Sequence, residues 1–354
     1  MTSRPATALL ALVLLANLAG CTRAGTSGDA GTAALTTAPD PQALFPVRGG
    51  GRVGFIDGMG RVVLDPAYAS VGEASGGIIP AEAGGQWGYI DRTGEWVIQP
   101  RFSQAGPFSE GLAPVAIGGK GAYVNPQGDV VIQPAYQGTG SFSEGHAAVE
   151  IGGLWGYVDP EGTMVIQPGY ASARAFAQGL AAVSSDDSNW GFIDPSGKVV
   201  IEEKFTDAYS FSGDRAVVRG ADGAFGLIDT TGKVIVEPTL FGARSFADGL
   251  AAVKVGSRWG FMKRSGEMAV EPSFDDAKSF TEGRGAVAVD GDCRDRDGKK
   301  VTVCWGFVDD QGKMVIPARY ASAEPFAHGL AQVEAQGGWG YVDTAGRVVW
   351  KPSM

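Results

Sequence analysis

The sequence predicts an all-β protein: a tandem array of nine three-stranded antiparallel meanders of about 34 residues each, stacked like a β-solenoid. The first observation is a repeated phrase of Trp, Gly, an aromatic residue, an aliphatic residue and Asp. Clear copies begin at Trp87, Trp155, Trp190, Trp305 and Trp339, and weaker ones at Val53, Gly121, Phe225 and Trp259. The second is that no stretch keeps a helical period for more than a turn or two. A fixed period of this length is typical of units that bury their apolar faces against their neighbours.

Residues 1–20 have the pattern of a signal peptide, with one charge at Arg4 and an apolar run that is too short to span a bilayer. The run ends in Leu18-Ala19-Gly20-Cys21, which resembles the lipobox of bacterial lipoproteins. The resemblance implies cleavage before Cys21 and lipid on that residue, which would anchor the chain in a membrane. The alternative is an ordinary secretory signal in which Cys21 is incidental.

Residues 21–43 are predicted to be a lipidated flexible tether, because the stretch after Cys21 is rich in Ala, Gly, Thr, Ser and Pro and too poor in large apolar residues to offset the entropy of ordering. The array then fills residues 44–354. We expect the protein in the cell envelope, lipid-anchored, and on the outer membrane (its periplasmic side or the cell surface) if the envelope has one.

One repeat shows how the strands are assigned. Residues 147–151, 154–158 and 164–168 are β-branched or aromatic runs separated by turn residues. Gly152-Gly153 supplies the positive φ of a tight hairpin. Asp159 and Gly162 stand at the first and fourth positions of a type I turn, and Pro168 ends the pairing. The connection that follows carries a second phrase, Phe176-Ala177-Gln178-Gly179, in which the Phe is expected to point inward.

The phase of the repeat bears on whether the array closes. Residues 44–66 already form a complete meander, and residues 332–352 complete the ninth. The chain therefore has no strand left over to pair its two ends by exchange. This phase favours an open stack, and the alternative is a propeller-like closed or curved array.

These phrases together resemble the WG-containing β-repeat family over roughly residues 44–352. The resemblance implies a repeat architecture, often secreted or surface-anchored, and it implies no reaction. The chain departs from the pattern at Gly121-Ala122, where Trp-Gly is absent, at Phe225, and at Lys263, which replaces the turn Asp.

Three sets of residues are candidates for chemistry. The serial Trp residues could stack on sugars, but their exchange with Val53 and Phe225 favours a packing role. The repeated Asp residues could bind calcium, but each stands opposite a turn Gly, which favours turn capping. The third set is a variable polar position at the end of the connection, and we predict it as the candidate binding face: Glu110, Glu144, Gln178, Asp248, Glu282 and His328.

The one irregular spacing places an insertion at about residues 290–304, which holds Cys293 and Cys304. Their symmetric placement about Gly298-Lys299 predicts a hairpin in which the two cysteines face each other and form a disulfide that rigidifies a projecting element. The Asp-rich tip is interpreted as a solvated turn, because Cys293 stands where a calcium loop needs Asp.

Composition limits the function. Removing Arg4 with the signal leaves 28 basic against 39 acidic residues, a net charge of −11, which argues against nucleic acid. Two His and the lack of a nucleophile motif predict no catalytic residue, no metal and no cofactor. Two hypotheses follow: a lipid-anchored scaffold that binds a protein or glycan of the envelope, or an envelope hydrolase that uses paired carboxylates on the array face.

Overall fold

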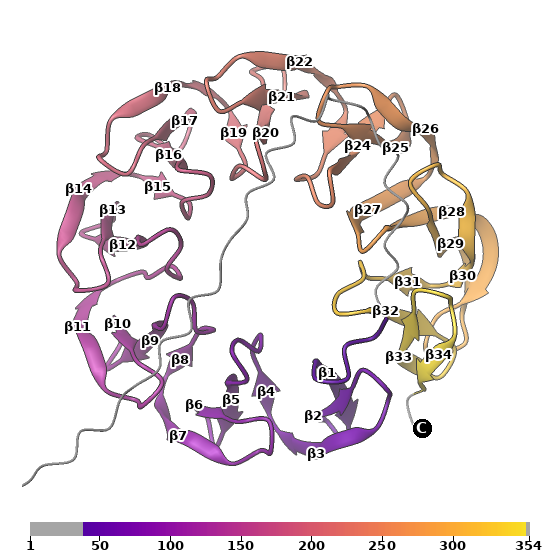
Figure 1. Ribbon diagram of the computed structural model, residues 1–354, viewed down its shortest axis with the longest axis horizontal. Helices are drawn as coiled ribbons and strands as arrows, with labels where there is room; N and C mark the ends of the chain where they lie inside the picture. Colours follow the sequence, from indigo (N-terminus) through magenta and orange to yellow (C-terminus); the bar gives the residue numbers. More distant parts are fainter. Residues whose placement is uncertain (1–37, 352–354) are drawn as a thin grey trace, which may run out of the picture. The chain divides into compact units, whose positions relative to one another are not determined.

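The computed structural model describes residues 38–351, and these form a ring of nine antiparallel sheets (Figure 1). The ring is a nine-bladed β-propeller, and each sheet is one blade. The prediction of an open, solenoid-like stack is therefore wrong, and its stated alternative, a closed array, is what the chain forms. The part of the chain that the structure describes contains no helix long and apolar enough to cross a membrane.

The blades follow the chain in order, and their strands are as follows. Blade 1 has β1 (Leu44–Gly49), β2 (Arg52–Asp57) and β3 (Val62–Tyr68). Blade 2 has β4 (Ser70–Val71), β5 (Ile79–Ala83), β6 (Gln86–Ile90) and β7 (Trp96–Phe102). Blade 3 has β8 (Gln104–Ala105), β9 (Ala113–Ile117), β10 (Lys120–Val124) and β11 (Val130–Tyr136). Blade 4 has β12 (Ala147–Ile151), β13 (Leu154–Val158) and β14 (Met164–Tyr170).

The second half of the ring is built in the same way. Blade 5 has β15 (Ser172–Ala173), β16 (Ala181–Ser184), β17 (Trp190–Ile193) and β18 (Val199–Phe205). Blade 6 has β19 (Asp207–Ala208), β20 (Arg215–Arg219), β21 (Phe225–Asp229) and β22 (Val234–Leu240). Blade 7 has β23 (Gly242–Ala243), β24 (Leu250–Val255), β25 (Arg258–Lys263) and β26 (Met268–Phe274). Blade 8 has β27 (Asp276–Thr281), β28 (Arg284–Arg294), β29 (Lys300–Val308) and β30 (Met314–Tyr320), and blade 9 has β31 (Ser322–Ala323), β32 (Leu330–Ala335), β33 (Gly338–Asp343) and β34 (Val348–Trp350).

The shape of the blades explains why the array closes. The connection after each meander adds a short strand to the next blade, as β15 does when it pairs with β16. This inner strand has two residues in most blades, whereas the outermost strand, such as β14 or β18, has seven. The blades are therefore narrow towards the centre and wide at the rim, as Figure 1 shows, and wedges stacked side by side curve into a ring.

The ring closes between blades 1 and 9 through side chains and one backbone bond. The rings of Phe45 and Tyr341 meet edge to face with centroids 5.4 Å apart, and the Tyr341 hydroxyl donates to the carbonyl of Pro46 at 2.8 Å. The amide of Asp40 donates to the carbonyl of His328 at 3.0 Å. No strand of the described chain is exchanged between the two blades, as the phase of the repeat predicts. Residues 38–43, predicted as the end of the tether, thus include a contact with the ring.

The Gly of the repeated phrase is required by a close approach of the backbone. A Cβ at Gly156 would lie 2.4 Å from the carbonyl oxygen of Ile166 and 2.7 Å from the nitrogen of Pro168 in the next strand. The register shifts at this point between Trp155 and Tyr157, which brings β14 against β13. The same approach recurs in six other blades, at Gly54, Gly88, Gly191, Gly226, Gly260 and Gly306.

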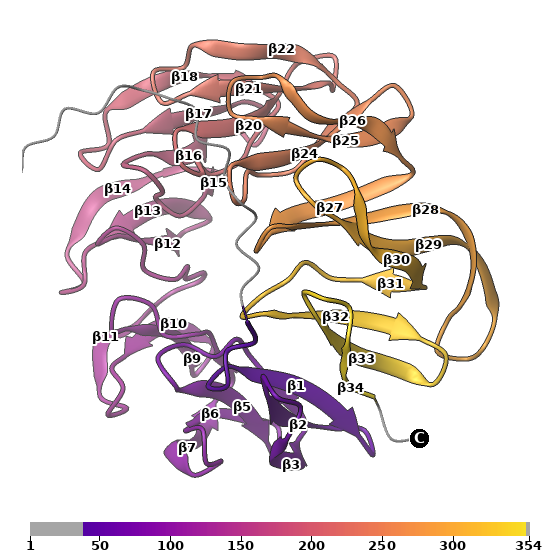
Figure 2. The ribbon, with the colours of Figure 1, turned by 45° about the vertical axis from the view of Figure 1, so that its right-hand side comes forward.

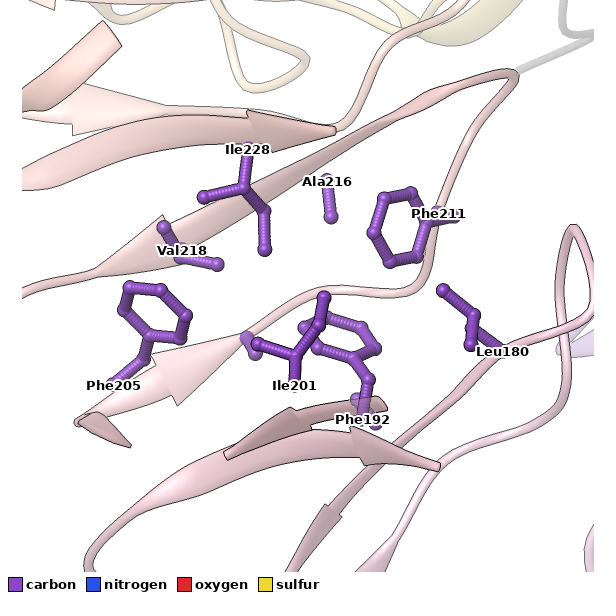
Figure 3. Close-up of a cluster of buried hydrophobic side chains, with 10 residues drawn as sticks. Leu180, Phe192, Ile201, Phe205, Phe211, Ala216, Val218 and Ile228 are labelled. Atoms are coloured by element: carbon purple, nitrogen blue, oxygen red, sulfur yellow. The ribbon is translucent and has the colours of Figure 1, made fainter. Parts of the chain in front are cut away.

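The hydrophobic core lies between consecutive blades. One cluster joins Phe192, Ile201 and Phe205 of blade 5 to Phe211 and Ile228 of blade 6, and Figure 3 shows these side chains facing one another across the gap between the two sheets. Most of the fully buried large side chains belong to the aromatic residue of the phrase or to the Phe of the connection. Each blade is therefore stabilised by its neighbours rather than by a core of its own.

Candidate functional site

The six predicted binding-face positions lie at equivalent turns. In each, the residue takes a positive φ, between 48° for Asp248 and 57° for Gln178, and all six are followed by a Gly that also has positive φ. Both central residues of a two-residue hairpin turn have this conformation in type I′ turns. The segments that carry these turns point towards the middle of the ring (Figure 1). The positions are therefore gathered along the inner rim.

Several of these side chains bind the next repeat. The carboxylate of Glu110 accepts the amides of Glu144 at 2.7 Å and Gly145 at 2.9 Å. Glu144 does the same for Gln178 at 2.7 Å and Gly179 at 2.8 Å. Glu282 accepts the amide of the Gly that follows His328, and Asp248 makes a longer contact of 3.4 Å to the next turn. The carboxylates thus have a structural use at the inner rim, and a binding role for this set remains a prediction.

The repeated Asp residues cap turns. The Asp91 carboxylate accepts the hydroxyl of Thr93 at 2.7 Å and its amide at 2.8 Å, and Asp194 and Asp229 repeat the arrangement with Ser196 and Thr231. These hydrogen bonds, led by the hydroxyl, lower the pKa of each of the three carboxyls. Their contribution to stability is therefore present above the ordinary carboxyl pKa and is lost as the pH falls below it. The turn-capping interpretation is confirmed for these residues.

The Trp residues of the phrase are half-buried and lie between blades. Trp155 packs on the same cluster as Ala173 of the next inner strand, and the same pairing recurs at Trp87 with Ala105, Trp190 with Ala208, Trp259 with Ala277 and Trp305 with Ala323. Three of the rings are also covered by a cation, with Arg174 at 4.8 Å from the Trp190 ring, Arg244 at 5.2 Å from Trp259 and Lys278 at 5.2 Å from Trp305. The packing interpretation holds, although burial is only partial.

Blades 2 to 4 differ from this pattern. Glycine replaces the cation at Gly72, Gly106 and Gly140, so no basic side chain of residues 38–351 lies over Trp87 or Trp155. In blade 3 the Trp itself is replaced by Gly121, and the Ala of the following inner strand is replaced by Thr139. A Cβ on Gly121 would lie 2.5 Å from Cγ2 of Thr139. The two departures are thus in contact.

The missing ring leaves a groove of about 950 Å³ that reaches from Trp87 to Trp155. Its polar side chains are Ser103, Gln104, Gln137 and Thr139, and none of the described residues that line it is charged. The chain has 39 acidic residues, so a groove lined by uncharged residues with a Trp at each end differs from the rest of its surface. The sequence shows the departure at Gly121, but that departure alone did not predict a site. The replacement of Ala by Thr139 in the next repeat is the second change that could have indicated one.

A second groove, of about 600 Å³, lies at the closure of the ring. The strand β1 contributes Pro46, Val47 and Arg48, blade 9 contributes Trp339 and Trp350 among others, and Arg296 reaches it from the inserted hairpin. In the part of the chain that the structure describes, neither groove is lined by Asp or Glu. Among the described residues there is also no group of three or more His, Cys, Asp or Glu side chains that could hold a metal ion.

The disulfide between Cys293 and Cys304 is present, with the Cα atoms 5.9 Å apart. The prediction that the two residues face each other is wrong: Cys293 pairs with Val301, and Cys304 pairs with Val289. A register shift between Asp290 and Cys293 lets the bridge join the strands diagonally. The hairpin does not project freely either, because the amide of Gly337 in blade 9 donates to the carbonyl of Arg296 at 3.1 Å. Figure 2 shows β28 and β29 reaching towards the last blade.

The comparisons with known proteins agree with this architecture. The model of the WG-containing repeat family matches eight segments that together cover most of the chain: residues 54–87, 87–120, 122–155, 155–187, 190–219, 225–259, 259–292 and 305–338. The chain belongs to the WG-containing repeat family. The ninth copy, at Trp339, lies beyond the matched segments. No curated protein sequence matches the chain.

Among solved structures, the chain is similar to a eukaryotic initiation factor, with a TM-score of 0.61 and 11% identity over 86% of this chain and 94% of that one. At this identity the likeness shows the fold alone. It also matches BamB from Moraxella catarrhalis with a TM-score of 0.47 and 15% identity, over 77% of this chain and 93% of that one. The predicted lipid site, Cys21, lies outside the described residues.

Proposed function

We propose that this WG-repeat propeller is a non-catalytic binding scaffold of the cell envelope, held at the membrane by lipid on Cys21, and that its blade 3 groove binds an uncharged oligosaccharide. The observation that carries the proposal is the groove opened at Gly121. Its volume is within the range of ligand sites, and it combines aromatic surface with a few amide and hydroxyl groups. Aromatic faces suit the C–H faces of sugar rings, and the amide and hydroxyl groups suit sugar hydroxyls.

Two features support a scaffold over the hydrolase alternative. A glycoside hydrolase needs two carboxyl groups within reach of one bond, about 5 to 10 Å apart. Among residues 38–351, no carboxyl group lines the groove at blade 3 or the groove at the ring closure. The carboxylates of Glu110 and Glu144 on the inner rim are instead bonded to backbone amides of the next repeat.

Refilling the groove tests the proposal. Gly121→Trp combined with Thr139→Ala installs the residues that most of the other repeats carry at these positions and removes the contact that a Cβ at 121 would make. We expect wild-type protein to bind uncharged oligosaccharides in calorimetric titrations and the double variant to bind at least about tenfold more weakly, because the added ring occupies the site. Its melting temperature should be equal or higher. A double variant that binds like the wild type, or a wild type that binds none of a panel of neutral glycans, would overturn the groove assignment.

The lipid anchor is tested separately. Intact-mass measurement of protein purified from its own membranes should show acyl chains and an amino terminus at Cys21, and Cys21→Ala should move the protein into the soluble fraction. An unlipidated Cys21 in membrane-associated protein would contradict this part of the proposal.

A further inference from the structure

We infer that the inner-strand position of blade 1, which none of residues 38–351 fills, is a strand-addition site for an extended peptide of a partner protein that carries an Asp-Ala pair. Blades 2 to 9 each have an inner segment paired with their next strand; in blade 4 it is reduced to the single bridge between Thr139 and Val149. Within residues 38–351, nothing pairs with the inner edge of β1. An exposed strand edge offers unpaired backbone groups to a second chain.

The hydrogen bonds at the closure show what is missing. In blade 3, the residue after the inner strand is Gly106: its amide donates to Pro114 at 2.8 Å, and its carbonyl accepts the hydroxyl of Tyr89 from the preceding blade at 2.9 Å. Pro46 occupies the position of Pro114, and Tyr341 that of Tyr89. Here the Tyr341 hydroxyl donates directly to the Pro46 carbonyl at 2.8 Å. In blade 1, the hydroxyl and the carbonyl that bind the inner residue in blade 3 are therefore hydrogen-bonded to each other.

The groove at the closure provides the space. Its volume of about 600 Å³ is bounded on one side by Pro46, Val47 and Arg48 of β1 and on the other by Trp339. In blades 2, 4, 5, 7 and 8 the corresponding Trp shares a cluster with the Ala of the next inner strand, as Trp305 does with Ala323. Among the described residues, Trp339 has no such Ala in blade 1. The site therefore has a place for one small side chain against an aromatic ring.

The inner strands of this chain indicate which peptide fits. Their second residue is Ala in six blades: Ala105, Ala173, Ala208, Ala243, Ala277 and Ala323. Arg48 lies opposite the first residue of such a peptide and takes the position that Arg219 has in blade 6. The residue opposite Arg219 is Asp207, in the pair Asp207-Ala208, although the Asp207 carboxylate itself pairs with Arg174 of the preceding blade at 2.8 Å. In blade 9 the place of Arg174 is taken by Glu324, which is paired with Lys278 at 2.7 Å, so Arg48 is the charged residue of the groove that faces the first peptide residue. Arg296 also lines the groove, so the charge of the site favours an acidic first residue.

The inferred complex adds three residues. Asp lies opposite Arg48, Ala packs near Trp339, and the third residue donates its amide to Pro46 and accepts the hydroxyl of Tyr341, whose bond to Pro46 is exchanged for these two. The site is separate from the blade 3 groove and does not depend on glycan binding there.

The probe is a capped peptide with the sequence Phe-Thr-Asp-Ala-Tyr-Ser, which is residues 205–210 of this chain. Calorimetric titration into the mature protein should show one site. Arg48→Glu, at an exposed position of β1, should weaken binding at least about tenfold by placing like charges together, and a peptide with Lys in place of Asp should recover affinity for that variant. Methylating the amide of the peptide Tyr should abolish binding to the wild type, because it removes the donor to Pro46.

Lys233→Glu makes the same charge change on an exposed turn residue and should leave the affinity unchanged. Failure of the peptide to bind the mature wild type would overturn the inference. This conclusion would hold even if the peptide is excluded because a segment of the same chain fills the position. Equal binding by the Arg48→Glu variant, or by the methylated peptide, would overturn it as well. None of these outcomes affects the glycan titration of the blade 3 groove.

Discussion

Gly156→Ala is expected to destabilise the propeller by about 3 kcal/mol, the upper end of the usual cost of overpacking. The added Cβ meets backbone atoms of Ile166 and Pro168, which can move only if β13 and β14 separate. Chemical denaturation followed by tryptophan fluorescence measures the change.

The matched control is Gly169→Ala in the same blade. At Gly169, the nearest atom to an added Cβ is 3.8 Å away, and φ is not in the left-handed region. This variant should be as stable as the wild type or slightly more stable. Similar losses for both substitutions would show that the close approach is not the reason for the Gly of the phrase.

Tyr157→Ala is expected to cost about 3–5 kcal/mol. The Tyr157 ring is fully buried, lies 4.9 Å from the ring of Phe176 in the next connection, and donates its hydroxyl to the carbonyl of Arg174 at 2.7 Å. Burial raises the pKa of Tyr157, so the hydroxyl stays protonated and keeps donating. The loss should appear in the same denaturation experiment as a lower midpoint.

Two variants separate the contribution of the Tyr157 hydrogen bond from that of the buried ring. Tyr157→Phe removes only the hydrogen bond and should cost about 1 kcal/mol. Trp155→Ala removes a half-buried ring and should cost less than Tyr157→Ala. The opposite order would mean that the Trp, rather than the aromatic residue two positions later, is the main contact between blades.

The strands and turns could be predicted from the sequence because each is determined by residues within a single repeat. The Gly152-Gly153 hairpin and the Asp159 turn are where the residues place them. Ring closure could not be predicted in this way, because it depends on two-residue inner strands such as Ser172–Ala173, which are too short to show a period. The angle between neighbouring blades depends on the shape of an entire blade rather than on any one residue.

The candidate sites were less accessible to sequence reasoning. The pairing of Cys293 with Cys304 followed from compartment and spacing, but the register shift after Asp290 did not. The groove at Gly121 depends on an absent ring and on a change 18 residues later, at Thr139, in the next blade. Only the three-dimensional structure brings these two positions into contact.

The central claim is that the repeated residues build the ring and that the departures in blades 2 to 4 bind the ligand. Hydroxyl-radical footprinting of the Trp residues, with and without a bound neutral oligosaccharide, tests it most directly. The account predicts protection of Trp87 and Trp155, and no change at Trp190, Trp259 and Trp305, whose rings are covered by cations. Protection spread evenly over all five residues, or confined to the last three, would contradict it.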